Sequence, residues 1–429
     1  MIKYRQPWRL PIFLYSIYIP CRKTKTYMKK EQETIVISNK HLPLRIALFV
    51  AALALAIFAF SKAITNLGIH EEGYYTIQAA SDKEAANYTS GIELSYHIKG
   101  ESVGEMRELY RGVTNEYTSI LARAYKLLDN TASYEGYNNL AYIYQHQGEK
   151  IVVSEELFGI LDDAYKKTLE QRGFNMFAGA LYKEWSDIVY SYDHEEIDPS
   201  VNEEEASRIA KIAALVNDLS NFELVLDKAE KSVIFNVSGE YEDAAEQLGI
   251  EVPALDLNLM KYAYMMEMIR AHFEAAGLTD GILTSDNGLL SGQYSLVINM
   301  EDVPLSYPVY GLDDDGKVYK ISDAGMDGKF SLAAFRSFPM TDEDLSAYTV
   351  TDADGNVHYR HMYFSVKTGF HTEMISMDYC FALSRSITDA AYANLCINSV
   401  ETYEEMKKDN KLADHLIRRV TETRFEEDQ

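Results

Sequence analysis

Side chains that bind metals or transfer protons are spread thinly along this sequence, and one region gathers histidines. His358, His361 and His371 fall within a single β-rich stretch. Because successive side chains of a strand point to opposite faces, His358 and His361 are expected on different faces. We therefore expect half-exposed strand histidines here rather than a metal cluster. The sequence contains no G-x-S-x-G, Walker A, H-E-x-x-H or paired C-x-x-C motif.

Two other features could carry chemistry. Cys380 and Cys396 could pair in an oxidising compartment, but two buried free thiols are the preferred interpretation, because three cysteines make no disulfide scaffold. The stretch TVTDADGNVHYR resembles a calcium-binding loop that starts at Asp352. An EF-hand loop needs glycine at its sixth position, where Val357 stands, so we expect a hairpin turn at Asp354-Gly355 instead.

Charge divides the chain into two parts. Residues 1–45 hold ten basic and two acidic side chains, a net charge of +8, and the other 384 residues hold 31 basic and 64 acidic ones, a net charge of −33. A body this acidic repels phosphate backbones, so nucleic acid is not an expected partner. The apolar and charged contents, 47% and 25%, exclude global disorder.

An unbroken apolar run follows the basic segment. Residues 46–60 read IALFVAALALAIFAF, with Arg45 before them and Lys62 after them. Residues 46–64 are long enough to be an uncleaved transmembrane anchor if the flanking basic side chains reach the membrane surface. A signal peptide cleaved near Ser61 and a buried core helix are the alternatives. A conventional start at Met28 is also possible.

The positive flank indicates the orientation in the membrane. Basic segments stay on the cytoplasmic side, so the N-terminus is expected in the cytoplasm and the acidic body outside it, on a single-pass membrane protein. The expected organisation has five parts. They are a basic segment (1–45), the anchor or signal segment (46–64), a linker (65–90), one domain (91–405) and a charged tail (406–429).

The pattern of the body predicts an α+β fold in a single domain. Helices are expected over 103–130, from an N-cap at Ser154 to Tyr165, and over 206–216, 257–276 and 388–397. Strands are expected in the ranges 91–100, 231–238, 281–284, 294–300, 318–321, 348–350, 357–365 and 373–382. The last third is therefore expected to be rich in strands.

Several segments in order resemble the FAD:protein FMN transferases, the ApbE-like flavin transferases, which are exported, membrane-anchored α+β domains. The clearest match is GFNMFAGALYKEW, residues 173–185, which is similar to the family's Phe-Asp-x-x-x-Gly-x-Leu-x-x-x-Trp pattern. Phe174, Gly179, Leu181 and Trp185 match it, and Asn175 stands where Asp is usual. These residue types mark packing, so the match supports the fold more than the activity.

The family's nucleotide-binding segments are matched with substitutions. Asp-Leu-Gly-Gly-Ile-Ala-Lys-Gly resembles DLNLMKYA, residues 256–263, in which Asn258 and Leu259 replace the glycines, and a shift of one residue would align Lys261 with the lysine. Glycines let a ligand approach the backbone, so Leu259 would place a side chain in the nucleotide's path. A downstream Gly-Gly pair is similar to Asn287-Gly288.

Two further motifs lie near the C-terminus. His-Ile-Ile-Asp-Pro-x-Thr-Gly is similar to HMYFSVKTG, which keeps His361, Thr368 and Gly369. Asp-Ala-x-x-Thr, which supplies magnesium ligands in the family, looks like DAAYA, with Asp389 kept and Ala393 in place of the threonine. The resemblance thus implies flavin-nucleotide contacts at Asp256, Asn258, Asn287, Gly288, His361, Thr368 and Gly369, and a metal ligand at Asp389. Asp389 could equally be an N-cap or first-turn acid of its helix.

The resemblance implies FAD and Mg²⁺ as the groups bound, and transfer of FMN from FAD to a Thr or Ser of an acceptor protein. Mg²⁺ has to neutralise charge and orient the attack in such a phosphoryl transfer. The substitutions make weakened or lost catalysis our first expectation, ahead of an active transferase with a divergent pocket. A flavin-binding scaffold and a pure protein-interaction module are the alternatives.

Overall fold

The computed structural model describes residues 71–80, 91–191, 194–286, 294–312, 318–336, 349–371, 379–384, 386–399, 416–421 and 424–428. All of these residues belong to one compact unit, Ile69–Gln429, and a separate unit comprises Met1–Gly68. The predicted anchor at 46–64 and the predicted contacts Asn287 and Gly288 lie outside the described residues. Within the described ranges, no helix combines the length and apolar character needed to cross a membrane.

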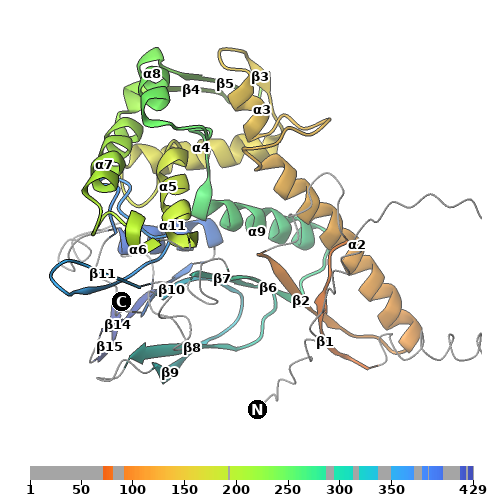
Figure 1. Ribbon diagram of the computed structural model, residues 1–429. Coiled ribbons are helices and arrows are strands. Elements are labelled where there is room, and N and C mark those ends of the chain that lie inside the picture. The colour runs from red at the N-terminus through yellow and green to blue at the C-terminus, as the bar shows by residue number, and fades with distance from the viewer. Residues whose placement is uncertain are drawn as a thin grey trace, which may run out of the picture. The chain divides into compact units, whose positions relative to one another are not determined.

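A large antiparallel sheet forms the base of this unit (Figure 1). Eight of the described strands join it in the order β1-β2-β6-β7-β10-β13-β14-β15, so the sheet mixes early and late parts of the chain. Their bounds are Gly73–Ile77 (β1), Glu93–Ile98 (β2), Gly281–Asp286 (β6), Tyr294–Asn299 (β7), Phe330–Arg336 (β10), Tyr379–Ser384 (β13), Leu416–Thr421 (β14) and Arg424–Asp428 (β15). In β7, Tyr294, Leu296 and Ile298 alternate with less buried neighbours, which gives the sheet a hydrophobic face.

Three helices cover this sheet. Helices α9 (Asn258–Ala275) and α11 (Ile387–Asn398) pack on its central strands, and α2 (Val103–Leu127) packs against α9 (Figure 1). Helix α9 buries apolar side chains around most of its circumference, as a central helix must. It ends before Gly277, whose φ of +71° favours glycine. Serines cap α2 and α11: Ser102 accepts from the Glu105 N–H, and Ser386 from the Asp389 N–H.

A second group of elements lies on the other side of these helices (Figure 1). Its three-stranded sheet has the order β3-β5-β4. The strands are Ile151–Val152 (β3), Phe222–Asp227 (β4) and Ser232–Val237 (β5). The surrounding helices are Leu140–Gln145 (α3), Glu155–Leu169 (α4), Gly179–Tyr190 (α5), His194–Ile197 (α6), Glu203–Asn217 (α7), Leu219–Asn221 (η1, a 3-10 turn) and Gly239–Leu248 (α8). The Ser154 hydroxyl accepts from the Leu157 N–H, which confirms the predicted N-cap of α4.

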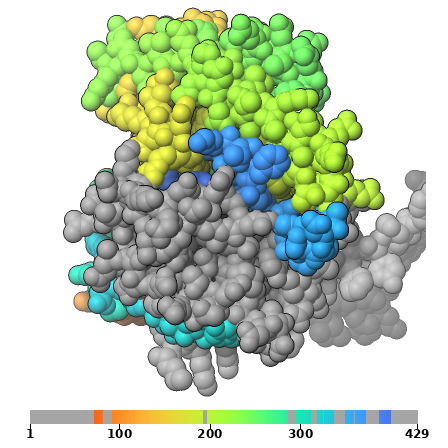
Figure 2. Space-filling model, turned by 90° about the vertical axis from the view of Figure 1, so that its left-hand side faces the viewer, coloured from red at the N-terminus to blue at the C-terminus, as the bar shows by residue number. Residues whose placement is uncertain are grey.

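Two hairpins complete the described structure: β8 (Leu305–Leu312) with β9 (Val318–Met326), and β11 (Thr349–Thr351) with β12 (Val357–Tyr359). The turn at Asp354-Gly355 is confirmed, because Gly355 has a φ of +87° and its N–H donates to the Asp352 carbonyl. The Asp352 carboxylate accepts hydrogen bonds from the Asn356 N–H and amide within this turn. On the face shown in Figure 2, the blue segment that contains this hairpin lies next to the yellow-green helices.

Three expectations about the chain's organisation need correction. The predicted linker 65–90 contains β1. Residues 73–77 pair with β2, so β1 forms one edge of the sheet. The predicted charged tail 406–429 contains β14 and β15, because residues 416–421 pair with β13 and residues 424–428 pair with β14. The strand expected over 357–365 ends at Tyr359, and an irregular loop follows it.

Candidate functional site

The matched segment 173–185 lies directly against the start of the segment 256–263. Gly179 begins α5, and a Cβ atom there would come within 2.2 Å of the Pro253 carbonyl oxygen. Its N–H donates to the Ala254 carbonyl, and the Asp256 N–H donates to the Met176 carbonyl at 2.8 Å. Gly179 is therefore needed for close backbone approach between the two segments, which explains its place in the pattern.

The turn that leads into α9 keeps the backbone shape of a glycine turn. Asn258 has a φ of +41°, in the left-handed region that asparagine tolerates better than most residues. Its N–H donates to Asp256 Oδ1 at 2.7 Å. Burial raises the pKa of Asp256, and the Asn258 hydrogen bond opposes this shift. Leu259 is buried in the hydrophobic core rather than exposed at this turn.

Lys261 is partly buried, and two acidic residues act on its charge. Burial lowers its pKa, and the charges of Asp129 and Asp256 oppose this effect. Burial alone would raise the pKa of Asp129, but hydrogen bonds from Tyr134 and Thr131 outweigh it and lower that pKa. The Lys261 ammonium lies 4.8 Å from the centre of the Tyr125 ring. Lys261 therefore lies in an acidic environment beside an aromatic ring.

His361 is enclosed by aromatic rings. Only 1% of its surface is exposed, and its ring centre lies 4.9 Å from that of Phe335 and 4.5 Å from that of His371. Its Nδ1 accepts from the Tyr363 N–H at 3.1 Å. Burial, together with the charge of Arg360, lowers the pKa of His361 to about 3, so the ring is neutral at physiological pH.

Gly369 and Thr368 stabilise the loop that follows. Trp185 Nε1 donates to the Gly369 carbonyl at 2.7 Å. Gly369 has a φ of +80°, and a Cβ atom there would lie 2.8 Å from Ile209 Cγ2 on α7. The Thr368 hydroxyl accepts from the Phe370 N–H at 3.3 Å. The loop thus packs on α5 and α7, and its matched residues take part in that packing.

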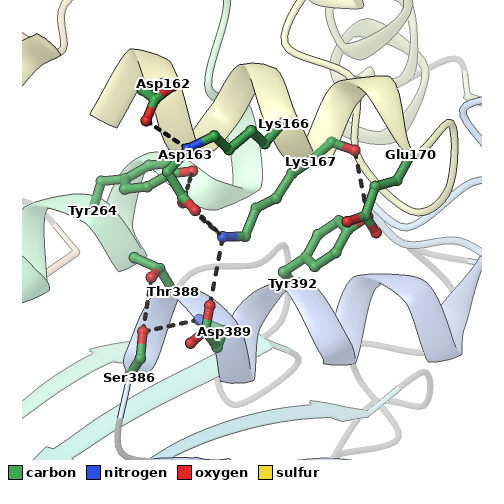
Figure 3. Close-up of polar contacts among 10 residues, drawn as sticks. All are labelled: Asp162, Asp163, Lys166, Lys167, Glu170, Tyr264, Ser386, Thr388, Asp389 and Tyr392. Atoms are coloured by element: carbon green, nitrogen blue, oxygen red, sulfur yellow. Dashed lines mark hydrogen bonds and ion pairs between the residues drawn. The ribbon is translucent and has the colours of Figure 1, made fainter. Parts of the chain in front are cut away.

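Asp389 lies in the first turn of α11 and faces α4 (Figure 3). The N-cap is Ser386, so the first-turn alternative for Asp389 agrees with its position. Lys167 Nζ lies 3.5 Å from Asp389 Oδ1, and it donates to both oxygens of Asp163 at 2.5 and 2.6 Å. The Tyr264 hydroxyl of α9 donates to Asp163 Oδ2 at 2.8 Å. A buried lysine therefore connects acids from α4 and α11.

A groove of about 510 Å³ opens beside this cluster, between α2, α4 and α9. Its lining includes Asp163, Tyr264 and Thr388 at the cluster, and Ile120, Ile160 and Met268 as apolar walls. None of the described residues that we predicted to contact the nucleotide lines this groove. The described site is thus spread over three places: the turn at Asp256–Asn258, the packed loop at His361–Gly369, and the cluster at Asp389.

Solved structures share this architecture at low sequence identity. The ApbE protein of Thermotoga maritima matches with a TM-score of 0.50 and 13% identity, over 83% of this chain and 97% of that chain. The chain has an ApbE-like fold. This confirms the predicted α+β fold. No protein-family model and no curated protein matches the sequence.

Two further ApbE-like structures were found. The flavin transferase ApbE of Vibrio cholerae matches with a TM-score of 0.49 and 10% identity, over 84% of this chain and 97% of that chain. The apo form of the flavinyl transferase ApbE of Pseudomonas stutzeri matches with a TM-score of 0.48 and 12% identity, over 83% and 92% of the two chains.

The residues around Asp389 do not fit the Mg²⁺ ion that the ApbE resemblance implies. Mg²⁺ requires about six oxygen ligands in near-octahedral geometry. Here a lysine ammonium, which repels a divalent cation, contacts the Asp389 carboxylate. Ala393, at the position of the expected threonine, is buried and offers no side-chain oxygen. Over the described ranges, no three His, Cys, Asp or Glu side chains converge as metal ligands.

The sequence did not single out Asp163, Lys167 or Tyr264. The available signal was the spacing of Asp163 and Lys167, four residues apart on one helix, but such pairs are common on exposed helices.

The three histidines of the β-rich stretch do not converge on one point. His358 contacts Asp352 at 3.0 Å, whereas His361 stacks on His371. Cys396 is a buried free thiol, which agrees with the preferred interpretation for this residue, and the Cys380 side chain lies outside the described residues.

Proposed function

We propose that this protein is a membrane-anchored, extracytoplasmic module with the ApbE-like fold that binds a flavin nucleotide without transferring FMN. The N-terminal segment would stay in the cytoplasm, residues 46–64 would span the membrane once, and the acidic body would lie outside. The basic flank and the apolar run support this orientation. The resemblance of segments 173–185 and 256–263 to flavin-transferase motifs suggests the class of ligand.

The observation that carries the loss of transfer is the Lys167 ammonium between Asp163 and Asp389. Transfer of FMN breaks the pyrophosphate of FAD and needs a divalent ion to neutralise the developing charge. A monovalent ammonium already saturated by two carboxylates supplies no such charge to a bound pyrophosphate. The three groups together carry a net charge of −1, which disfavours an approaching phosphate.

The turn at Asp256–Asn258 supports the flavin-binding part of the proposal. Asn258 keeps a positive φ, so the backbone retains the turn that the glycines of the resembled motif would form. Leu259 packs into the core, so its side chain does not project from this turn. We assign the nucleotide contacts to Asp256 and Asn258, with Asn287 and Gly288 as further predicted contacts.

A transfer assay tests the proposal. Full-length protein, purified in mild detergent, is incubated with FAD, Mg²⁺ and an acceptor domain that an active ApbE flavin transferase modifies in a parallel reaction. We expect no AMP release and no covalently fluorescent acceptor. Release of AMP that Asp389→Asn abolishes would contradict the loss of catalysis and favour an active transferase.

A further inference from the structure

We propose that the Lys167 ammonium is the resident cation at the junction of α4, α9 and α11, in the place that the resemblance gives to Mg²⁺, and that it keeps divalent ions out. This inference builds on the proposed function, because it concerns the same site. Its test measures metal binding rather than flavin chemistry, so the two can fail separately.

The contacts of Lys167 show that its ammonium group is a buried and paired part of the folded structure. Its side chain is 9% exposed, and among the described residues it forms ion pairs with Asp163 on α4 and Asp389 on α11. Lys166, the next residue, makes a similar pair with Asp162 four residues earlier, but its side chain is 67% exposed. Figure 3 shows the two lysines leaving α4 in different directions, and only Lys167 points toward α11.

Without the lysine, the same place would present oxygen ligands to a divalent cation. Asp163 and Asp389 would face each other with no charge between them, and the Tyr264 hydroxyl lies within hydrogen-bonding distance of Asp163. Carboxylate and hydroxyl oxygens, with water, suit Mg²⁺ and Mn²⁺. The groove lined by Asp163 and Tyr264 gives an ion from solvent a way in. Lys167 is thus the side chain that decides whether this site holds a metal.

The experiment measures Mn²⁺ binding to full-length protein by electron paramagnetic resonance, in which only free Mn²⁺ gives the six-line signal. Wild-type protein is expected to leave the signal unchanged. Lys167→Ala should bind Mn²⁺ at least about tenfold more tightly than wild type, because the repulsion from the ammonium is gone. Asp389→Asn in the Lys167→Ala background should remove the gain.

Two matched variants isolate the role of the cation. Lys167→Arg keeps the positive charge and should show no gain in Mn²⁺ affinity. Lys166→Ala removes a neighbouring lysine with a similar partner and should behave as wild type. Thermal unfolding provides a second measurement. Mn²⁺ should raise the unfolding midpoint temperature of Lys167→Ala and leave that of the wild type and the two matched variants unchanged.

Binding of Mn²⁺ by wild-type protein, weakened by Asp389→Asn, would overturn the proposal without any lysine variant. Equal Mn²⁺ affinities of folded Lys167→Ala and Lys167→Arg would overturn it too. If Lys167→Ala folds only when Mn²⁺ is present, the proposal is supported, because a metal then replaces the missing cation. If that variant stays unfolded with Mn²⁺, the metal cannot replace the lysine and the proposal fails.

Discussion

Replacing Trp185 by alanine is expected to lower the free energy of unfolding by about 4 kcal/mol, among the largest effects of any single substitution. Trp185 is 1% exposed, its ring centre lies 3.9 Å from that of His371, and its Nε1 donates to the Gly369 carbonyl. The substitution would leave a large cavity between α5 and the loop at 361–371, and it would leave a carbonyl without its donor. Denaturant unfolding of the purified protein measures the change.

Trp185→Phe is the matched variant for this prediction. It keeps most of the aromatic volume but removes the N–H that binds the Gly369 carbonyl. We expect a loss of about 1–3 kcal/mol, smaller than that of the alanine variant. If Trp185→Ala loses less than about 1 kcal/mol, the tryptophan does not anchor this loop as described.

Acidification from pH 7 to pH 4 is expected to destabilise the protein through His361 by on the order of 3 kcal/mol. Burial holds the pKa of His361 at about 3 in the folded protein. In the unfolded chain this pKa is about 6.5. Below pH 6.5 the unfolded chain therefore binds a proton that the folded protein does not, and stability falls with pH until about pH 3.

The difference between wild type and His361→Gln isolates this effect from the titration of carboxylates. The variant should be less stable at pH 7, because it loses ring packing, but its stability should fall less steeply between pH 6.5 and pH 4. Burial also lowers the pKa of His371, so part of the pH dependence should remain in the variant. Parallel curves for the two proteins would show that His361 is not held neutral by the fold.

The sequence predicted the elements that local patterns determine. The apolar periodicity of α2, the serine before α4 and the glycine after α9 each have a local physical cause, and the structure contains all three. The strand β1 was missed because its partner β2 lies outside the predicted linker, and β14 because its pairing with β13 joins the predicted tail to the domain. Charged or polar residues at the edge of a sheet resemble a linker until the partner strand is known.

The site was predictable where one residue type implies one backbone shape. Asn258 stands at a glycine position of the resembled motif, and asparagine is among the few residues that tolerate its positive φ. The burial of Lys167 was not predictable, because it depends on α11, which is far away in the sequence. His361 and Gly369 matched a ligand-binding motif, yet tertiary packing against Phe335 and α7 determines their surroundings.

The most direct test of the account is an equilibrium titration of full-length protein with FAD, with and without Mg²⁺, followed by flavin fluorescence and by measurement of AMP. We predict saturable binding with the same affinity in both conditions and no release of AMP. Absence of FAD binding would contradict the flavin-binding proposal and favour a protein-interaction module on this fold. Binding that tightens with Mg²⁺, or AMP that accumulates, would contradict a site in which Lys167 has replaced the metal.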